Sequence, residues 1–198
     1  MKTKTYLFFD TETTGLPIDY NAHYSNVDNF PRLVQLSWLL YQDNEEISYS
    51  DFVIIPENFI IPEESSKIHG FTTQYCQEKG YDLKKVLNKF YTDFSLCDSL
   101  VAHNMNFDKN IIMSELARNN ADKFAKKIEE SNTFCTMMNS IKFCNLPGKR
   151  GLKFPKLIEL YVKLFGEVFE DQHNALNDVR ATAKCFFKMK ELNLIKEL

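Results

Sequence analysis

The stretch YLFFDTETTG, residues 6–15, decides the fold of this chain. Its apolar start predicts a buried strand over residues 6–10, and Thr and Gly residues predict a turn at 13–15. Side chains two apart on a strand point the same way, so we expect Asp10 and Glu12 to project from one face at the open end of a sheet. Two such carboxylates repel each other unless a cation lies between them, and Mg²⁺ prefers oxygen ligands of this kind. Asp-x-Glu alone is common in solvated loops, so a metal site requires further acidic residues.

Composition places the chain among folded globular proteins. Its 198 residues, 44% hydrophobic and 14% aromatic, are most simply one domain over residues 1–198. A formal net charge of −3 argues against a generally basic nucleic-acid coat but allows a local basic patch. The five cysteines include no Cys-x-x-Cys pair, which argues against a disulfide framework or a structural zinc site and favours a cytoplasmic protein. No segment approaches the roughly 20 apolar residues that span a bilayer, so we expect no membrane partner.

The order of the predicted elements indicates an α/β fold. Strand 6–10 is followed by strands 33–42 and 47–55, joined by a hairpin at 43–46, and by a short buried strand at 99–102. Helices are predicted, in chain order, over residues 62–68, 82–94, 106–118, 155–166 and 175–192. Three strands followed by alternating helix and strand are typical of α/β proteins. The polar segment 17–31 is long for an internal connection, which makes it a candidate lid.

A second acidic motif, HNMNFD at residues 103–108, follows the strand 99–102. Asp108 falls in the first turn of the next helix, where the helix N-terminus favours negative charge and the carboxylate faces the end of the sheet. Capping of the helix by Asp108 is an alternative interpretation, and Asn104 could equally be the cap.

The third motif, HNALND at residues 173–178, begins the last predicted helix. His173 lies just before the helix and Asp178 lies in its second turn, so the histidine can lean over the carboxylate. An exposed loop histidine beside an unrelated Asp is the alternative. Near a carboxylate cluster, His173 is a natural general base, because its unperturbed pKa of about 6.5 is close to working pH.

Four carboxylates from these motifs fit one chemical task. They are Asp10, Glu12, Asp108 and Asp178. Four negative charges are too many to bury unpaired, but they suit two divalent ions held about 4 Å apart. Such a pair promotes in-line attack of water on a phosphodiester, with His173 removing the proton of the water.

The three motifs together resemble those of the DEDDh branch of the DEDD 3′→5′ exonuclease superfamily, which includes the proofreading ε subunit of bacterial DNA polymerase III. A histidine five residues before the last Asp marks this branch, and the segment IHGFT, residues 68–72, is similar to one common in it. The resemblance covers residues 6 to about 190. It implies a ribonuclease H-like fold, in which helices flank a mixed five-stranded sheet whose first three strands are antiparallel. It also implies two Mg²⁺ or Mn²⁺ ions and release of nucleoside 5′-monophosphates from a 3′ end.

Substrate contacts follow from the resemblance and from charge. The resemblance implies that Thr13, His69 and Phe107 lie near the terminal nucleotide, although His69 could simply end a helix. Independently, residues 142–156 carry five basic residues and no acidic one, among them Lys149 and Arg150. This segment is either an arm that contacts the phosphates of a single strand or an ordinary solvated loop.

The expected function is therefore metal-dependent 3′→5′ exonuclease activity on single-stranded DNA or frayed DNA 3′ ends, with a polymerase or a repair enzyme as a possible partner. An RNA-directed relative, such as an oligoribonuclease or an RNA 3′-end trimming enzyme, is the alternative, since nothing in the motifs reads a 2′-hydroxyl. A non-catalytic nucleic-acid-binding module is a further alternative. The intact set of five catalytic residues argues against that module.

Overall fold

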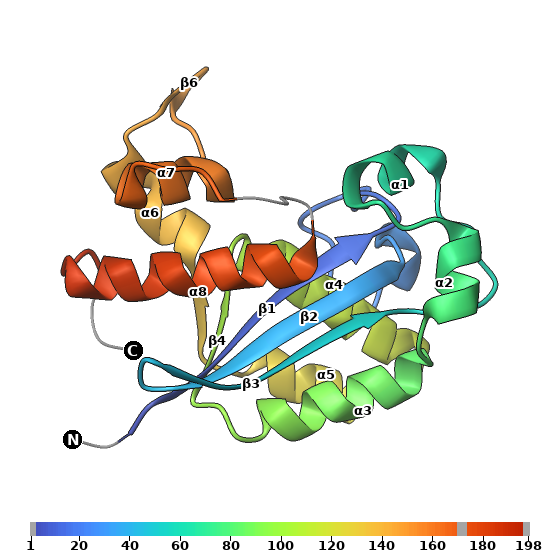
Figure 1. The fold of residues 1–198 in the computed structure, drawn as a ribbon. Helices are drawn as coiled ribbons and strands as arrows, with labels where there is room; N and C mark the ends of the chain where they lie inside the picture. Colours follow the sequence, from blue (N-terminus) through green and yellow to red (C-terminus); the bar gives the residue numbers. More distant parts are fainter. Residues whose placement is uncertain (1–2, 170–173, 196–198) are drawn as a thin grey trace.

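The computed structural model describes residues 3–169 and 174–195. Within them, five strands form a mixed sheet in the order β3-β2-β1-β4-β5 (Figure 1). These strands are β1 (Thr5–Thr13), β2 (Leu33–Gln42), β3 (Glu45–Val53), β4 (Ser99–Ala102) and β5 (Thr133–Cys135). β1 is antiparallel to β2 and parallel to β4, and the first three strands are antiparallel neighbours, as predicted.

Helices cover both faces of this sheet (Figure 1). They are α1 (Glu63–His69), α2 (Thr73–Lys79), α3 (Leu83–Phe94), α4 (Met105–Arg118), α5 (Asp122–Glu129), α6 (Thr136–Cys144), α7 (Leu157–Phe165) and α8 (Ala175–Glu191), with a 3-10 turn η1 (Val27–Asn29). A short hairpin of β6 (Pro147–Gly148) and β7 (Gly151–Leu152) projects between α6 and α7. Within the described ranges, no helix combines the length and the apolar character needed to cross a membrane.

The apolar run of β1 packs on both sides of the sheet. Tyr6 and Phe8 lie in the core beneath α8, whereas Leu7 and Phe9 lie in the larger core formed with α3 and α4. Strands buried on both faces are apolar at every position, which is why this run shows no polar alternation.

The alternation of β1 continues into its acidic end, because the strand extends three residues beyond the predicted residue 10. Asp10 and Glu12 continue the row of side chains that faces α8, and Thr11 continues the opposite row, which faces α4. The strand therefore fixes the direction of both carboxylates without help from the following turn.

Several elements differ from the sequence prediction. β3 begins two residues earlier, after a tight connection at Asp43, which has a φ of 53°. α7 begins at Leu157, and not at Pro155. α5, β5, α6 and the β6–β7 hairpin were not predicted. β5 and the hairpin strands are too short for a readable period, and α5 buries little more than Ala125 and Ile128.

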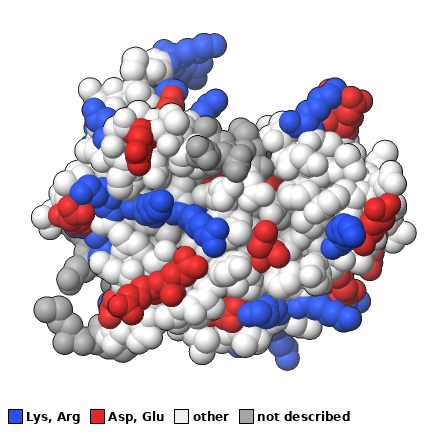
Figure 2. Space-filling model, viewed as in Figure 1, with Lys and Arg blue, Asp and Glu red and all other residues white. Residues whose placement is uncertain are grey.

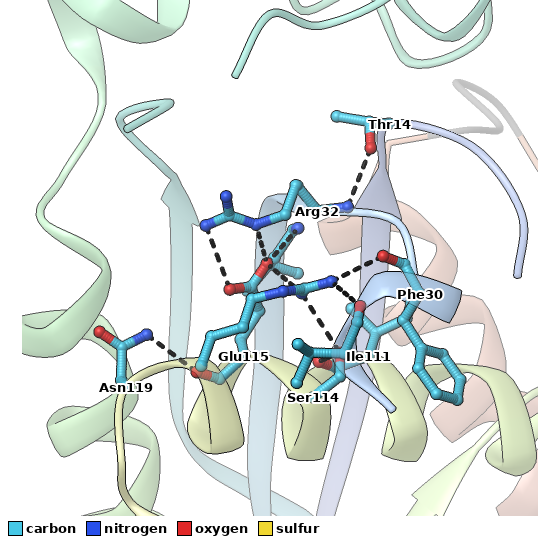
Figure 3. A network of polar contacts seen from close by, with 10 residues as sticks. Thr14, Phe30, Arg32, Ile111, Ser114, Glu115 and Asn119 are labelled. Carbon is cyan, nitrogen blue, oxygen red and sulfur yellow. Dashed lines mark hydrogen bonds and ion pairs between the residues drawn. The ribbon is translucent and has the colours of Figure 1, made fainter. Parts of the chain in front are cut away.

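The segment before β2, proposed above as a lid, is anchored to α4 through a buried carboxylate (Figure 3). Glu115 is fully buried and accepts from Nε of Arg32 at 2.8 Å, from Nη1 of Arg118 at 3.0 Å and from the Leu33 amide at 3.1 Å. Arg118 also donates to the carbonyl of Phe30 at 2.7 Å. These bonds hold the end of the segment in place, so a lid movement there would leave a buried charge unpaired.

Candidate active site

Three of the predicted metal-ligating residues come together at the end of β1. Asp10, Glu12 and Asp178 each place one carboxylate oxygen within 4.8 Å of the others. Asp10 and Glu12 point toward α8 because of the strand alternation, and Asp178 lies in the first turn of α8. α8 packs across this face of the sheet, so its N-terminal turn meets the end of β1 (Figure 1).

The electrostatics of this cluster favour a bound cation. The pKa of Asp10 is raised well above its usual value by burial, and further by the charges of Asp108, Asp178 and Glu12. Burial and the charges of Asp178 and Asp108 raise the pKa of Glu12 to about 8. Among residues 3–169 and 174–195, no Lys or Arg forms a salt bridge with Asp10 or Glu12. Hard divalent cations would remove this repulsion, so the donor set fits them.

Asp108 approaches the cluster from the opposite side of the sheet, on α4. Its Oδ1 accepts from the Thr11 hydroxyl at 2.7 Å and from the Thr11 amide at 3.1 Å, and its side chain is buried. Burial raises its pKa to about 7, although the bonds from Thr11 oppose this. Asp108 is therefore held by β1 and does not cap α4; the N-cap position is Asn104, whose side chain makes no capping bond. Both Thr11 bonds use Oδ1, and Asp108 is not among the described residues whose carboxylate oxygens lie within 4.8 Å of one another.

Gln35 is a supporting residue that the sequence analysis missed. It lies opposite Glu12 in the β1–β2 register and is only 1% exposed. Its Oε1 accepts from the Ala175 amide at 3.1 Å, and its Nε2 donates to Asp51 at 2.7 Å. The side chain thereby ties the N-terminus of α8 to the sheet beside Glu12. A polar residue inside the apolar run LVQLSWLL was the signal that could have revealed it.

The predicted general base, His173, lies outside the described residues. The next residue, Asn174, is the N-cap of α8, and its side chain accepts from the Leu176 amide at 3.1 Å. This cap fixes where the chain enters the helix that carries Asp178.

The structure places His69 and Thr13 close together, and it places Phe107 near the start of α4. His69 is the last residue of α1 and is 7% exposed; its Nδ1 accepts from the Phe71 amide at 3.1 Å. Burial lowers its pKa, the nearby Thr13 backbone opposes this shift, and Nε2 makes no hydrogen bond within the described residues. The His69 ring is therefore neutral, and with its proton on Nε2 it presents a buried hydrogen-bond donor beside β1. Phe107 is partly buried against the large core.

Lys149 and Arg150 lie at the turn of the β6–β7 hairpin and are exposed. Figure 2 shows basic side chains gathered at the tip of this projection, and it shows the surface hollowed between the projection and α1. Both residues are thus outside the carboxylate cluster, at the tip of the projection.

Comparison with known proteins agrees with this arrangement. Residues 7–186 match the RNase_T exonuclease family. The chain is 24% identical over 189 residues to the DNA polymerase III subunit epsilon of Buchnera aphidicola, covering 94% of this chain and 75% of that protein. It is 27% identical to a PolC-type DNA polymerase III of Mycoplasmopsis pulmonis, covering 98% of this chain but only 12% of that protein.

Solved structures show the same fold. Exonuclease I of E. coli, solved with a dA16 oligonucleotide, superposes with a TM-score of 0.74 at 21% identity, over 96% of this chain and 42% of that one. This likeness confirms the predicted ribonuclease H-like fold, and the family match confirms the predicted exonuclease class. The motifs, the carboxylate cluster and the match over residues 7–186 lead to one conclusion: the chain belongs to the RNase_T exonuclease family, with the DEDDh-type motifs of a 3′→5′ exonuclease.

Proposed function

We propose that this chain hydrolyses single-stranded DNA, or frayed DNA 3′ ends, from the 3′ terminus and releases nucleoside 5′-monophosphates with two divalent metal ions. The convergence of Asp10, Glu12 and Asp178 within 4.8 Å carries this proposal. DNA is favoured because the relatives are named as DNA polymerase III components and the exonuclease I structure contains a dA16 oligonucleotide. The polymerase names also support a polymerase as a partner.

The residues of the chain divide the work of this reaction. Asp10, Glu12 and Asp178, with Oδ2 of Asp108, would hold the ions, Mg²⁺ or Mn²⁺. When bound, such ions lower the pKa of the attacking water and neutralise charge on the leaving oxygen. Thr11 donates two hydrogen bonds to Asp108, and these favour its ionised form against the effect of burial.

The substrate and the attacking water are handled by residues around the cluster. In this proposal His173 takes the proton of the attacking water, as a general base. The Nε2 donor of His69 lies beside Thr13, where it can bind the terminal nucleotide, and Phe107 lies one residue before Asp108 for the same task. Lys149 and Arg150 contact phosphates further along the strand.

A gel time course tests the proposal. DNA and RNA oligonucleotides of one sequence, labelled at the 5′ end, are incubated with Mg²⁺, with Mn²⁺ or with EDTA. We expect a metal-dependent ladder that shortens from the 3′ end, faster on DNA, and loss of that ladder in Asp10→Asn. Glu130→Gln, an exposed change at the end of α5, should retain it. Faster RNA shortening would identify an RNA-directed enzyme, and no shortening of either by folded protein would refute the exonuclease proposal.

A further inference from the structure

The β6–β7 hairpin combines exposed cations with an exposed aromatic ring. All residues from 147 to 154 are exposed, including Lys149 and Arg150 at the turn. Lys153 pairs with Glu159, while Lys149 and Arg150 form no salt bridge in the part of the chain that the structure describes. At the base of the hairpin, Phe154 is 58% exposed and lies in none of the hydrophobic clusters of the described residues.

The segment that carries Phe154 is anchored directly at the end of the sheet. The next residue, Pro155, is buried, and its carbonyl lies 3.0 Å from Nε2 of His103. Nδ1 of His103 lies 2.9 Å from the Thr136 hydroxyl. Burial lowers the pKa of His103 to about 4, so the ring is neutral at neutral pH and has one proton to donate. Nε2 donates it to the carbonyl, which can only accept, and Nδ1 accepts from Thr136.

The position of His103 places this anchor beside the carboxylate cluster. His103 follows β4, which pairs in parallel with β1 so that Phe8 lies opposite Val101. His103 comes directly after Ala102, the last residue of β4, and the carboxyl ends of parallel neighbours such as β4 and β1 lie at the same edge of a sheet. The base of the hairpin is therefore anchored, through His103, at the end of the sheet where β1 carries Asp10 and Glu12.

We propose that Phe154 is a base-stacking site for single-stranded nucleic acid, on the path by which the strand reaches Asp10, Glu12 and Asp178. The inference rests on the proposed nuclease function and adds a specific binding residue to it. A base has an apolar face and an adjacent phosphate, and this segment offers an exposed ring at its base and the cations Lys149 and Arg150 at its turn. His103 is a positioning residue, since its bond to Pro155 sets the distance between the ring and the cluster.

Binding in EDTA tests the stacking separately from turnover. Fluorescence anisotropy gives the Kd of a labelled single strand of about 12 nucleotides. Phe154→Ala should weaken binding by about 5- to 100-fold, the usual effect of losing one stacked base. Leu96→Ala is the matched control, because Leu96 is 62% exposed before the opposite end of β4 and should bind like the wild type. Equal Kd values for Phe154→Ala and the wild type would overturn the proposal.

A Trp reporter gives a direct signal of stacking. The chain has one tryptophan, Trp38, which is fully buried. Phe154→Trp should therefore bind like the wild type and lose indole emission when the oligonucleotide is added. Unchanged emission at saturating oligonucleotide would also overturn the proposal.

Substrate length separates failure of this inference from failure of the nuclease function. A nitrophenyl ester of a single nucleotide lacks the further bases that would stack on Phe154. Phe154→Ala and His103→Leu should raise KM for the oligonucleotide but leave kcat/KM for the ester unchanged, and His103→Gln, which keeps a donor, should recover part of the loss. Equal losses on both substrates would assign Phe154 and His103 a merely structural role. If the wild type cleaves neither substrate, the nuclease function itself is refuted.

Discussion

Replacing Glu12 by Gln should make the metal-free protein more stable at neutral pH. The folded pKa of Glu12 is raised from 4.5 to about 8, so the unfolded chain releases this proton at a lower pH than the folded protein does. The stability from the protonated carboxyl is fully present below about pH 4.5 and is lost as the pH rises toward 8. Each pH unit in this window lowers the free energy of unfolding by about 1.4 kcal/mol, so the protein loses about 2–3 kcal/mol of stability between about pH 5 and pH 7.

Thermal unfolding in EDTA measures this effect. A loss of 2–3 kcal/mol corresponds to about 5–10 °C in Tm for a chain of this size. When the pH rises from 5 to 7, the Tm of the wild type should therefore fall by roughly 5–10 °C more than the Tm of Glu12→Gln. Saturating Mg²⁺ should stabilise the wild type more than the variant, because the cation favours the ionised carboxylate. Glu63→Gln, on the surface of α1, should follow the wild type. Identical pH curves for wild type and Glu12→Gln in EDTA would refute the assignment of a repulsive, buried cluster.

Three further perturbations test other parts of the structure. Glu115→Ala leaves two arginines without their buried partner, so urea unfolding should show a loss of about 3–5 kcal/mol, against little change for Glu63→Ala. Gln35→Leu frees the N-terminus of α8, so the Mg²⁺ concentration for half-maximal activity should rise about 10- to 100-fold; an unchanged Mg²⁺ titration would rule out this positioning role. His173→Ala should lower kcat by about 10²–10⁴ and remove the acidic limb of the pH–rate profile, whereas retention of that limb would assign the general base elsewhere.

The candidate site was predictable to the extent that it depends on local periodicity. Alternation along β1 sets the direction of Asp10 and Glu12 from residue spacing alone. Helix α8 begins at Ala175 as predicted, but Asp178 lies in its first turn and not in the predicted second turn. Each of these placements involves only neighbours in the chain.

The short elements were not predictable for a related reason. β5 has three residues, and β6 and β7 have two each, so a period has no length over which to repeat. α5 is mostly exposed, and a polar helix of that length resembles a loop in sequence. These elements form because the body of the domain supplies their partners.

The sequence by itself determined the acidic donors, the order of the main strands and the exonuclease motifs, because strand and helix periods repeat over a few residues. Only the tertiary structure decided which side chains support the donors. Asp108 bonds to Thr11 across 97 residues, and Gln35 accepts from the Ala175 amide across 140. Such partners depend on which faces of the sheet α4 and α8 cover, and that choice is made by burial of the whole apolar surface and not by any local pattern.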